Sequence, residues 1–289
     1  MTNKTSSPDA RAKRALYARR IMMKAGATDE RVLRAFARIP REDFLGPGPW
    51  RVATAQGYHT TPSADPVHVY QDAVIALDEQ AGVNNGEPSL HARAIAALAL
   101  RAGMRVAHVG AGSGYYSAIL AELIGPNGSL VAYEMDDALA ARAVENLRFW
   151  RQARVVHGNG ATAALPPCDA LYVSCAAERP MDAWLDALAV GGRLLFPLAP
   201  RDGGGAMLLV TRTSGSRDAF AARFLTPCLF IPCAGAEDEM GAESLRRAFA
   251  AKGMRDVRTL WRGGASATGE AWAEGDGWRL SAAPPGGGD

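Results

Sequence analysis

The stretch that decides the fold of this chain is Arg105-Val-Ala-His-Val-Gly-Ala-Gly-Ser-Gly-Tyr-Tyr-Ser-Ala-Ile-Leu-Ala121. Its apolar start, Val106 to Val109, predicts a buried strand, and apolar residues return at helical spacing after position 115. Between them stand glycines 110, 112 and 114, where the backbone must bend sharply and let a ligand approach its amide groups. The following helix would present its N-terminal N–H groups to that ligand. The pattern predicts a nucleotide-like cofactor, with a plain tight turn as the alternative.

A second strand, Gly128 to Glu134, narrows the choice of cofactor. It ends in a carboxylate about twenty positions after the glycine turn, where such a group can accept both hydroxyls of an adenosine ribose. Ser117 stands where a dinucleotide-binding turn would have its last glycine. This favours a ligand with ribose and adenine but without pyrophosphate, and S-adenosylmethionine fits that description.

Further strands are predicted at 154–157, 169–174 and 191–197, alternating with helices at 139–150 and 184–188. This alternation predicts an α/β fold with a doubly wound, mostly parallel, Rossmann-like sheet whose ligand lies at the carboxyl ends of the strands. The expected cofactor-binding residues fall at that edge. They are Gly110, Ala111, Gly112, Gly114, Tyr115, Glu134, Met135, Gly158, Asn159, Gly160 and Ser174.

The polar turn from Asn84 to His91, just before the first core strand, is the expected acceptor side of the site. We expect Asn85, Gly86, Ser89 and His91 to face the methyl acceptor. His91 could act as a base for a hydroxyl acceptor or pack within a helix, and Glu87 could bind a substrate ammonium or cap that helix. His59 and His68 have no third ligand that the sequence places beside them, so no metal site is predicted.

Three parts of the chain differ in pattern. Residues 1–82 combine helical patterning up to about Phe44, a long irregular loop at 44–71 and a predicted strand at 72–78. Within the helical part, Thr28-Asp29-Glu30-Arg31 predicts the cap that opens a second helix. Residues 83–235 form the predicted S-adenosylmethionine-binding core. Residues 236–289 form a C-terminal extension with a predicted helix at 244–251 and a flexible tail.

The composition limits the partners and the cellular location that can be expected for this protein. The chain has 289 residues, 48% hydrophobic and 21% charged, with a net charge of +2, so no general attraction to nucleic acid or membrane is expected. No run reaches the length of a membrane span, and the N-terminus lacks the apolar segment of a secretory signal. Four cysteines without C-x-x-C spacing are expected to be buried thiols in a reducing compartment, which predicts a cytoplasmic protein.

Several of these segments together resemble the protein-L-isoaspartate O-methyltransferase family. They are the run Val109 to Tyr116, the pair Gly158-Asn-Gly160, Trp184 to Leu188, and Gly191 to Leu198. The likeness extends over about Asp29 to Leu198 and includes Ile39-Pro-Arg-Glu-Asp-Phe44. It implies the class I S-adenosylmethionine-dependent methyltransferase fold, that cofactor, and methyl transfer to a carboxylate oxygen.

The chain departs from the family pattern at three places. The family usually has an acidic residue where His108 stands, to help fix the methionine end of the cofactor, and Gly-Asp-Gly where Gly158-Asn159-Gly160 stands. Its Thr-Ile-Ser-x-Pro segment corresponds here to Asn84-Asn-Gly-Glu-Pro88, so the hydroxyl that would meet the substrate is missing. Ser89 or the asparagines could substitute for it.

The acceptor therefore stays open at this point. Transfer to a carboxylate needs no general base and depends mainly on holding the oxygen in line with the departing sulfur. The candidates are an isoaspartyl peptide, a small-molecule or modified-peptide biosynthetic intermediate, and no acceptor at all if the protein is a non-catalytic cofactor-binding scaffold. Amino methylation of bases is disfavoured, because Asp169 to Tyr172 contains no Asn-Pro-Pro-Tyr-like segment and no basic, aromatic-rich surface is evident. The oligomeric state and the pathway do not follow from the sequence.

Overall fold

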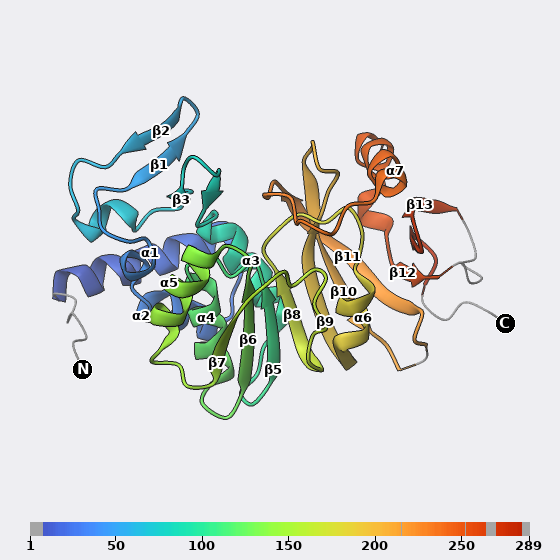
Figure 1. Ribbon diagram of the computed structural model, residues 1–289, viewed down its shortest axis with the longest axis horizontal. Helices are drawn as coiled ribbons and strands as arrows, with labels where there is room; N and C mark the ends of the chain where they lie inside the picture. The colour runs from blue at the N-terminus through green and yellow to red at the C-terminus, as the bar shows by residue number, and fades with distance from the viewer. Residues whose placement is uncertain (1–7, 215, 252, 264–269, 285–289) are drawn as a thin grey trace. The chain divides into compact units, whose positions relative to one another are not determined.

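A computed structural model describes residues 8–214, 216–251, 253–263 and 270–284 (Figure 1). The chain divides into two compact units, each described by itself below. The first comprises residues up to Gly103 together with Ala111–His157. The second comprises Met104–Gly110 together with the chain from Gly158 onward. This division crosses the predicted three-part division, which stays a prediction, and the predicted flexible tail falls largely on residues 285–289, outside the described part.

The first unit begins with the predicted helices. Helix α2 starts at Asp29, whose carboxylate accepts a hydrogen bond from the backbone N–H of Arg31 at 2.9 Å, confirming the predicted cap. Helices α1 and α2 pack on each other and on α3, which follows the predicted acceptor turn. Their bounds are α1 (Pro8–Ala25), α2 (Glu30–Arg38), the 3₁₀ helix η1 (Arg41–Phe44) and α3 (Pro88–Leu98).

The Rossmann-like part of the first unit contains two parallel strands with two helices packed against them (Figure 1). Asp136 caps α5 by accepting the N–H of Leu139 at 2.8 Å. The bounds are α4 (Tyr115–Ile124), β6 (Ser129–Glu134), α5 (Asp137–Leu147) and β7 (Ala153–His157). These elements follow the predicted alternation of helix and strand.

Two predictions in the N-terminal part are wrong. The loop expected at 44–71 contains a hairpin of β1 (Arg51–Thr54) and β2 (Gly57–Thr60) and a 3₁₀ helix, η2 (Pro66–Val69). The hairpin escaped prediction because, of its two strands, only Val52 is buried, so no apolar alternation marks them. The strand expected at 72–78 is limited to β3 (Ala76–Asp78), which pairs with β4 (Val83–Asn84).

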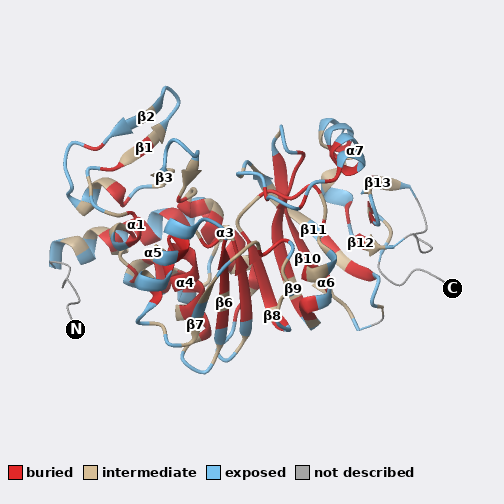
Figure 2. Cartoon of the chain, in the orientation of Figure 1, coloured by how far each residue is buried: buried red, intermediate tan, exposed pale blue. Residues whose placement is uncertain are grey.

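The second unit contains a sheet that is parallel on one side and antiparallel on the other. Its strands follow the order β13, β14, β12, β11, β10, β9, β8, β5. Strand β8 pairs in parallel with both β5 and β9, and the remaining pairs are antiparallel. The bounds of this first group are β5 (Arg105–Val109), β8 (Cys168–Val173), α6 (Asp182–Ala187), β9 (Leu188–Leu198), β10 (Gly205–Arg212) and β11 (Ala219–Cys228). Figure 2 shows that β8, β9 and β10 are largely buried, as expected for a central sheet.

The C-terminal extension is more regular than predicted. Besides the expected helix, found as α7 (Glu239–Ala250), it contains the 3₁₀ helix η3 (Met254–Asp256) and three strands, β12 (Thr259–Arg262), β13 (Ala271–Gly275) and β14 (Trp278–Ser281). The strands are anchored at buried Asp238, whose carboxylate caps α7 at Gly241 and accepts the indole N–H of Trp278 at 2.7 Å. This bond joins residues 40 positions apart, so no local pattern announces it.

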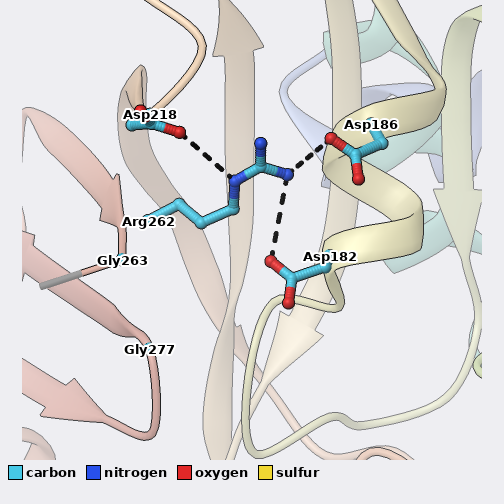
Figure 3. A pocket seen from close by; sticks show the side chains of 6 residues that line it. All are labelled: Asp182, Asp186, Asp218, Arg262, Gly263 and Gly277. Carbon is cyan, nitrogen blue, oxygen red and sulfur yellow. Dashed lines mark hydrogen bonds and ion pairs between the residues drawn. The ribbon is translucent and has the colours of Figure 1, made fainter.

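Arg262 makes a second anchor in the extension (Figure 3). Its guanidinium lies 2.6 Å from Asp186, 3.6 Å from Asp218 and 3.9 Å from Asp182. These four side chains line a hollow of about 490 Å³ together with Gly263 and Gly277. The aspartates are more than half exposed. We therefore interpret the group as an ion-pair cluster that holds β12, in which each exposed pair contributes little to stability.

In the described ranges, no helix has the length and apolar character to cross a membrane.

Candidate active site

The glycine turn takes its shape from left-handed backbone conformations. Gly112 has φ of +57° and Gly114, the residue that opens α4, has φ of +92°. L-residues with a Cβ rarely adopt these angles. The turn is joined to β6, because the N–H of Ala111 donates to the carbonyl of Tyr133 at 3.0 Å. The first unit therefore contains the left-handed glycines that lead into α4, as the sequence predicts.

Glu134 lies at the end of β6 and meets this turn. Its side chain is largely buried, with 8% of the residue exposed. One carboxylate oxygen accepts the N–H of Gly112 at 2.6 Å, and the other accepts the N–H of Asp136 at 3.0 Å. Each carboxylate oxygen has a further lone pair, so Glu134 can hold the turn and still accept ribose hydroxyls. The next residue, Met135, is 56% exposed, and its carbonyl lies 3.1 Å from His157 Nε2.

In the second unit, Ser174 and His108 lie together at the ends of β8 and β5. Ser174 Oγ is 3.0 Å from His108 Nε2, and the imidazole stacks on Tyr172 with ring centroids 5.2 Å apart. His108 is fully buried, and burial lowers its pKa to about 3. The ring is therefore neutral at ordinary pH. It cannot supply the negative charge that the family usually has at this position.

Gly110 closes this second-unit group. It has φ of +78°, and an added Cβ would lie 3.5 Å from the backbone of Ser174. The structure thus brings together Gly110 and Ser174 in one unit, and Gly112 and Glu134 in the other. The binding roles predicted for them stay predictions.

Asn159 is engaged within its own unit. Its amide nitrogen donates to the carbonyl of Ala234 at 2.8 Å, and its amide oxygen accepts the N–H of Ala161 at 2.8 Å. The carbonyl of neighbouring Gly160 accepts the indole N–H of Trp184 at 2.9 Å. These bonds hold the loop after β7 against the chain that follows β11. Asn159 retains one amide hydrogen and one lone pair for a ligand, so its predicted place beside the adenine stays open.

The acceptor turn, Asn84 to Pro88, is held mainly from outside itself. The N–H of Asn85 donates to the carbonyl of Ile75 at 2.8 Å, and its carbonyl accepts the hydroxyl of Tyr116 at 3.0 Å. Within the turn, the N–H of Gly86 donates to Asn84 Oδ1 at 2.9 Å, and Gly86 has φ of +62°. Only part of this geometry could have been expected from the local sequence.

Arg41 donates two of the hydrogen bonds that hold that turn. Nothing in the sequence predicted a role for this residue. Its side chain is fully buried, and its guanidinium makes five hydrogen bonds. They run from Nε to Asn85 Oδ1 (3.0 Å), from Nη1 to the carbonyls of Val69 (3.2 Å) and Gln71 (3.1 Å), and from Nη2 to those of Ala73 (2.8 Å) and Gly86 (3.2 Å). All five guanidinium donors can thus be used. The bonds to Gln71 and Ala73 also explain why that segment is not the strand predicted there.

Ser89 is fixed at the start of α3 by a neighbouring carboxylate. Its N–H donates to Asp72 Oδ1 at 2.7 Å, so the side chain that caps α3 is Asp72 rather than Glu87. Lys24 Nζ lies 2.6 Å from Asp72 and 2.5 Å from Glu87. Burial by itself raises the pKa of Asp72, but the bonds from Lys24 and Ser89 outweigh it and hold that pKa below its usual value. A substrate ammonium at Glu87 would have to compete with Lys24.

His91 is packed in the protein interior. It is 3% exposed, and its ring lies parallel to that of Tyr116, with centroids 3.6 Å apart and planes at 3°. This arrangement favours the packing interpretation over that of a base. Among the described residues, no group of three or more His, Cys, Asp or Glu side chains is arranged to hold a metal ion.

Comparison with known proteins places these features in a family. The model of the protein-L-isoaspartate(D-aspartate) O-methyltransferase family matches residues 13–238. A protein-L-isoaspartate O-methyltransferase from Methanothermobacter thermautotrophicus is 31% identical over 219 residues, covering 74% of this chain and 92% of that protein. One from Ralstonia nicotianae is 34% identical over 236 residues, covering 77% and 68%.

Solved structures agree on the fold. A protein-L-isoaspartate O-methyltransferase superposes with a TM-score of 0.64 at 23% identity, covering 82% of this chain and 69% of the other. A protein described as a putative protein-L-isoaspartate O-methyltransferase from Plasmodium falciparum, in complex with S-adenosyl-L-homocysteine, superposes with a TM-score of 0.61 at 18% identity, covering 76% and 97%. They confirm the predicted α/β, Rossmann-like methyltransferase fold. The family match ends at residue 238, which leaves α7 and β12 to β14 outside it.

Proposed function

Because this chain belongs to the protein-L-isoaspartate O-methyltransferase family, we propose that it transfers the methyl group of S-adenosylmethionine to a carboxylate oxygen of an isoaspartyl peptide. The observation that carries the proposal is the contact between Glu134 and the glycine turn. A buried carboxylate stands at the end of β6 beside the glycine turn, bonded to the N–H of Gly112. An acidic residue at this place in a doubly wound sheet can bind the hydroxyls of an adenosine ribose.

The residues present fit that cofactor. Glu134 retains lone pairs for the ribose hydroxyls, and exposed Met135 offers an apolar surface beside it for the adenine. An added Cβ at Gly112 would lie within 4 Å only of a Leu77 methyl group, at 3.5 Å, among the described atoms, so the space beside its Cα is open. When bound, the cofactor would supply an electrophilic methyl group on a sulfonium. We also assign cofactor-binding roles to Ala111, Gly114 and Tyr115 in the first unit. In the second unit we assign them to Gly110, Gly158, Asn159, Gly160 and Ser174.

The acceptor side of the reaction depends on position rather than on proton transfer. A carboxylate is already ionised at neutral pH, so buried His91 is not needed as a base. In this proposal Asn85, Gly86 and Ser89 face the acceptor, and Arg41 holds the side chain of Asn85 and the carbonyl of Gly86 in place. Rate enhancement then comes from aligning the carboxylate oxygen with the methyl group and the sulfur.

A second acceptor class is favoured by one observation. Residue 86 is a glycine with φ of +62°, so a hydroxyl is missing from the place where the family usually has one. A small-molecule acid or a modified-peptide intermediate is therefore the alternative acceptor. A scaffold that binds the cofactor without catalysis is the alternative outside the enzyme class.

The deciding experiment uses S-adenosylmethionine labelled on its methyl group. The protein is incubated with an isoaspartyl peptide and, as a control, with the aspartyl peptide of the same sequence. Base-labile label on the isoaspartyl peptide alone supports the proposal. No label there but label on small carboxylic acids assigns the alternative acceptor, and calorimetric binding of the cofactor with no labelled acceptor supports the scaffold.

We propose a cytoplasmic location, supported by the four free thiols Cys168, Cys175, Cys228 and Cys233. We propose that neither nucleic acid nor membrane is a partner, since the net charge is only +2. Fractionation of cells and a nucleic-acid binding assay at low salt test these two statements.

A further inference from the structure

The imidazole of His91 fills the space that a side chain at position 86 would need. A Cβ added at Gly86 would lie 2.2 Å from His91 Nε2, 2.9 Å from Cδ2 and 3.3 Å from Cε1. Three ring atoms therefore stand where a side chain of residue 86 would begin. Cβ contacts of 2.2 and 2.9 Å essentially never occur in folded proteins, so a side chain at position 86 requires the imidazole to move.

The imidazole has little freedom to move. It is stacked on Tyr116 at a centroid distance of 3.6 Å, and both residues are at least 95% buried. The Tyr116 hydroxyl in turn donates to the carbonyl of Asn85 at 3.0 Å. The ring, the tyrosine and the acceptor turn thus form a closed set of contacts, and displacing the ring also disturbs the Asn85–Gly86 peptide.

We propose that Gly86 and His91 are an interlocked pair in which the imidazole replaces a side chain at position 86. His91 is then a positioning residue: through Tyr116 and Gly86 it fixes the Asn85–Gly86 peptide, and with it the turn that faces the acceptor carboxylate. The interlock stands on the geometry alone, whereas its effect on the acceptor rests on the proposed function.

The first test is a double-mutant cycle on stability, which needs no substrate. Four proteins are compared by thermal unfolding: wild type, Gly86→Ser, His91→Ala and Gly86→Ser/His91→Ala. Gly82→Ser is the matched control, because Gly82 has φ of +70° and, among the described residues, an added Cβ there has no heavy atom within 4 Å. It carries the backbone strain of a left-handed serine without the collision.

We expect Gly82→Ser to lower Tm by about 3 °C and Gly86→Ser by about 6 °C or more, because the collision adds to the strain. The double variant should lose less than the sum of its single variants, by about 3 °C. Equal losses for Gly82→Ser and Gly86→Ser, or strict additivity in the cycle, would overturn the interlock.

The second test measures binding and turnover. In His91→Ala we expect the KM for the acceptor carboxylate to rise about tenfold, because the turn is no longer fixed, while the Kd for S-adenosylhomocysteine changes less than about twofold. A merely structural role would weaken both. Unchanged acceptor KM in His91→Ala contradicts the positioning role. If wild type methylates no carboxylate while the stability cycle shows coupling, the proposed function fails and the interlock remains.

Discussion

The glycine turn at Ala111–Gly114 and the acceptor turn at Asn84–Pro88 belong to the same unit but are held by different means. The glycine turn is shaped by left-handed glycines and by one carboxylate, Glu134. The acceptor turn has Gly86 as its left-handed residue and otherwise depends on side chains far away in the chain. Arg41 is 44 positions from Asn85, and Tyr116 is 31 positions from it.

This difference decides which contacts of each turn survive a change of residue type. Replacing a glycine that has positive φ introduces backbone strain at once, so the glycine turn tolerates little change. The acceptor turn is held through its carbonyls by Arg41 and Tyr116, and carbonyls are the same for every residue type. These two bonds survive a change of residue type, whereas the bond from Arg41 to Asn85 Oδ1 and the left-handed conformation of Gly86 do not.

Removing the guanidinium should have the largest effect. Arg41→Met leaves the Asn85 side chain and four carbonyls without their donors. We expect a loss of about 3 to 5 kcal/mol in the free energy of unfolding, measured by urea denaturation. Arg41→Lys is the matched control, and it should recover little, because an ammonium has three donors and lacks the planar fork. A loss below about 1 kcal/mol in Arg41→Met would show that the acceptor turn holds its shape locally.

The carboxylate of the glycine turn should matter for binding more than for stability. Glu134→Ala removes the expected partner of both ribose hydroxyls, and we expect the Kd for S-adenosylhomocysteine, measured by calorimetry, to rise about 100-fold. Glu134→Gln keeps one acceptor oxygen and should show about a tenfold rise. Should Glu134→Ala instead destabilise the protein as much as Arg41→Met, the contrast between the two turns would disappear.

The smallest predicted effect is a pH dependence of the stability, caused by His108 in the strand that leads into the glycine turn. The pKa of buried His108 is about 3 in the folded protein, below the ordinary value of about 6.5. As the pH falls through 6.5, the unfolded chain binds this proton and the folded protein does not. Stability is therefore greatest above about pH 6.5 and decreases at lower pH, by at most about 1.4 kcal/mol per pH unit.

Urea denaturation between pH 7 and pH 5 measures this slope. His108→Gln removes the titrating ring and should make the curve flatter by about 1 to 2 kcal/mol over that range. A slope that is the same in both proteins would mean that the His108 site is open to water. Ser174, which contacts the ring, would then lie in a more polar surrounding than the structure indicates.

Predictions from the sequence succeeded where neighbouring residues set the conformation. Gly112 and Gly114 predicted the turn, Asp29 the cap of α2, and the alternation after Gly128 the parallel strands. They failed at the β1–β2 hairpin, where exposed strands carry no apolar period, and in β12 to β14, which are anchored at Asp238. Arg41 escaped notice because an arginine inside a short polar segment resembles a surface residue until its burial is known.

The sequence by itself determined the alternation of strands and helices from β5 to β9, the left-handed turn and the carboxylate expected to meet the ribose. Each depends on a few adjacent residues and on the repeat of apolar positions. Tertiary structure decided how the acceptor turn is held: by a buried guanidinium, by a tyrosine hydroxyl, and by an imidazole in the space of an absent side chain. Those contacts join residues that only folding brings together, and the energy of burying a charge or filling a space depends on all the neighbours at once.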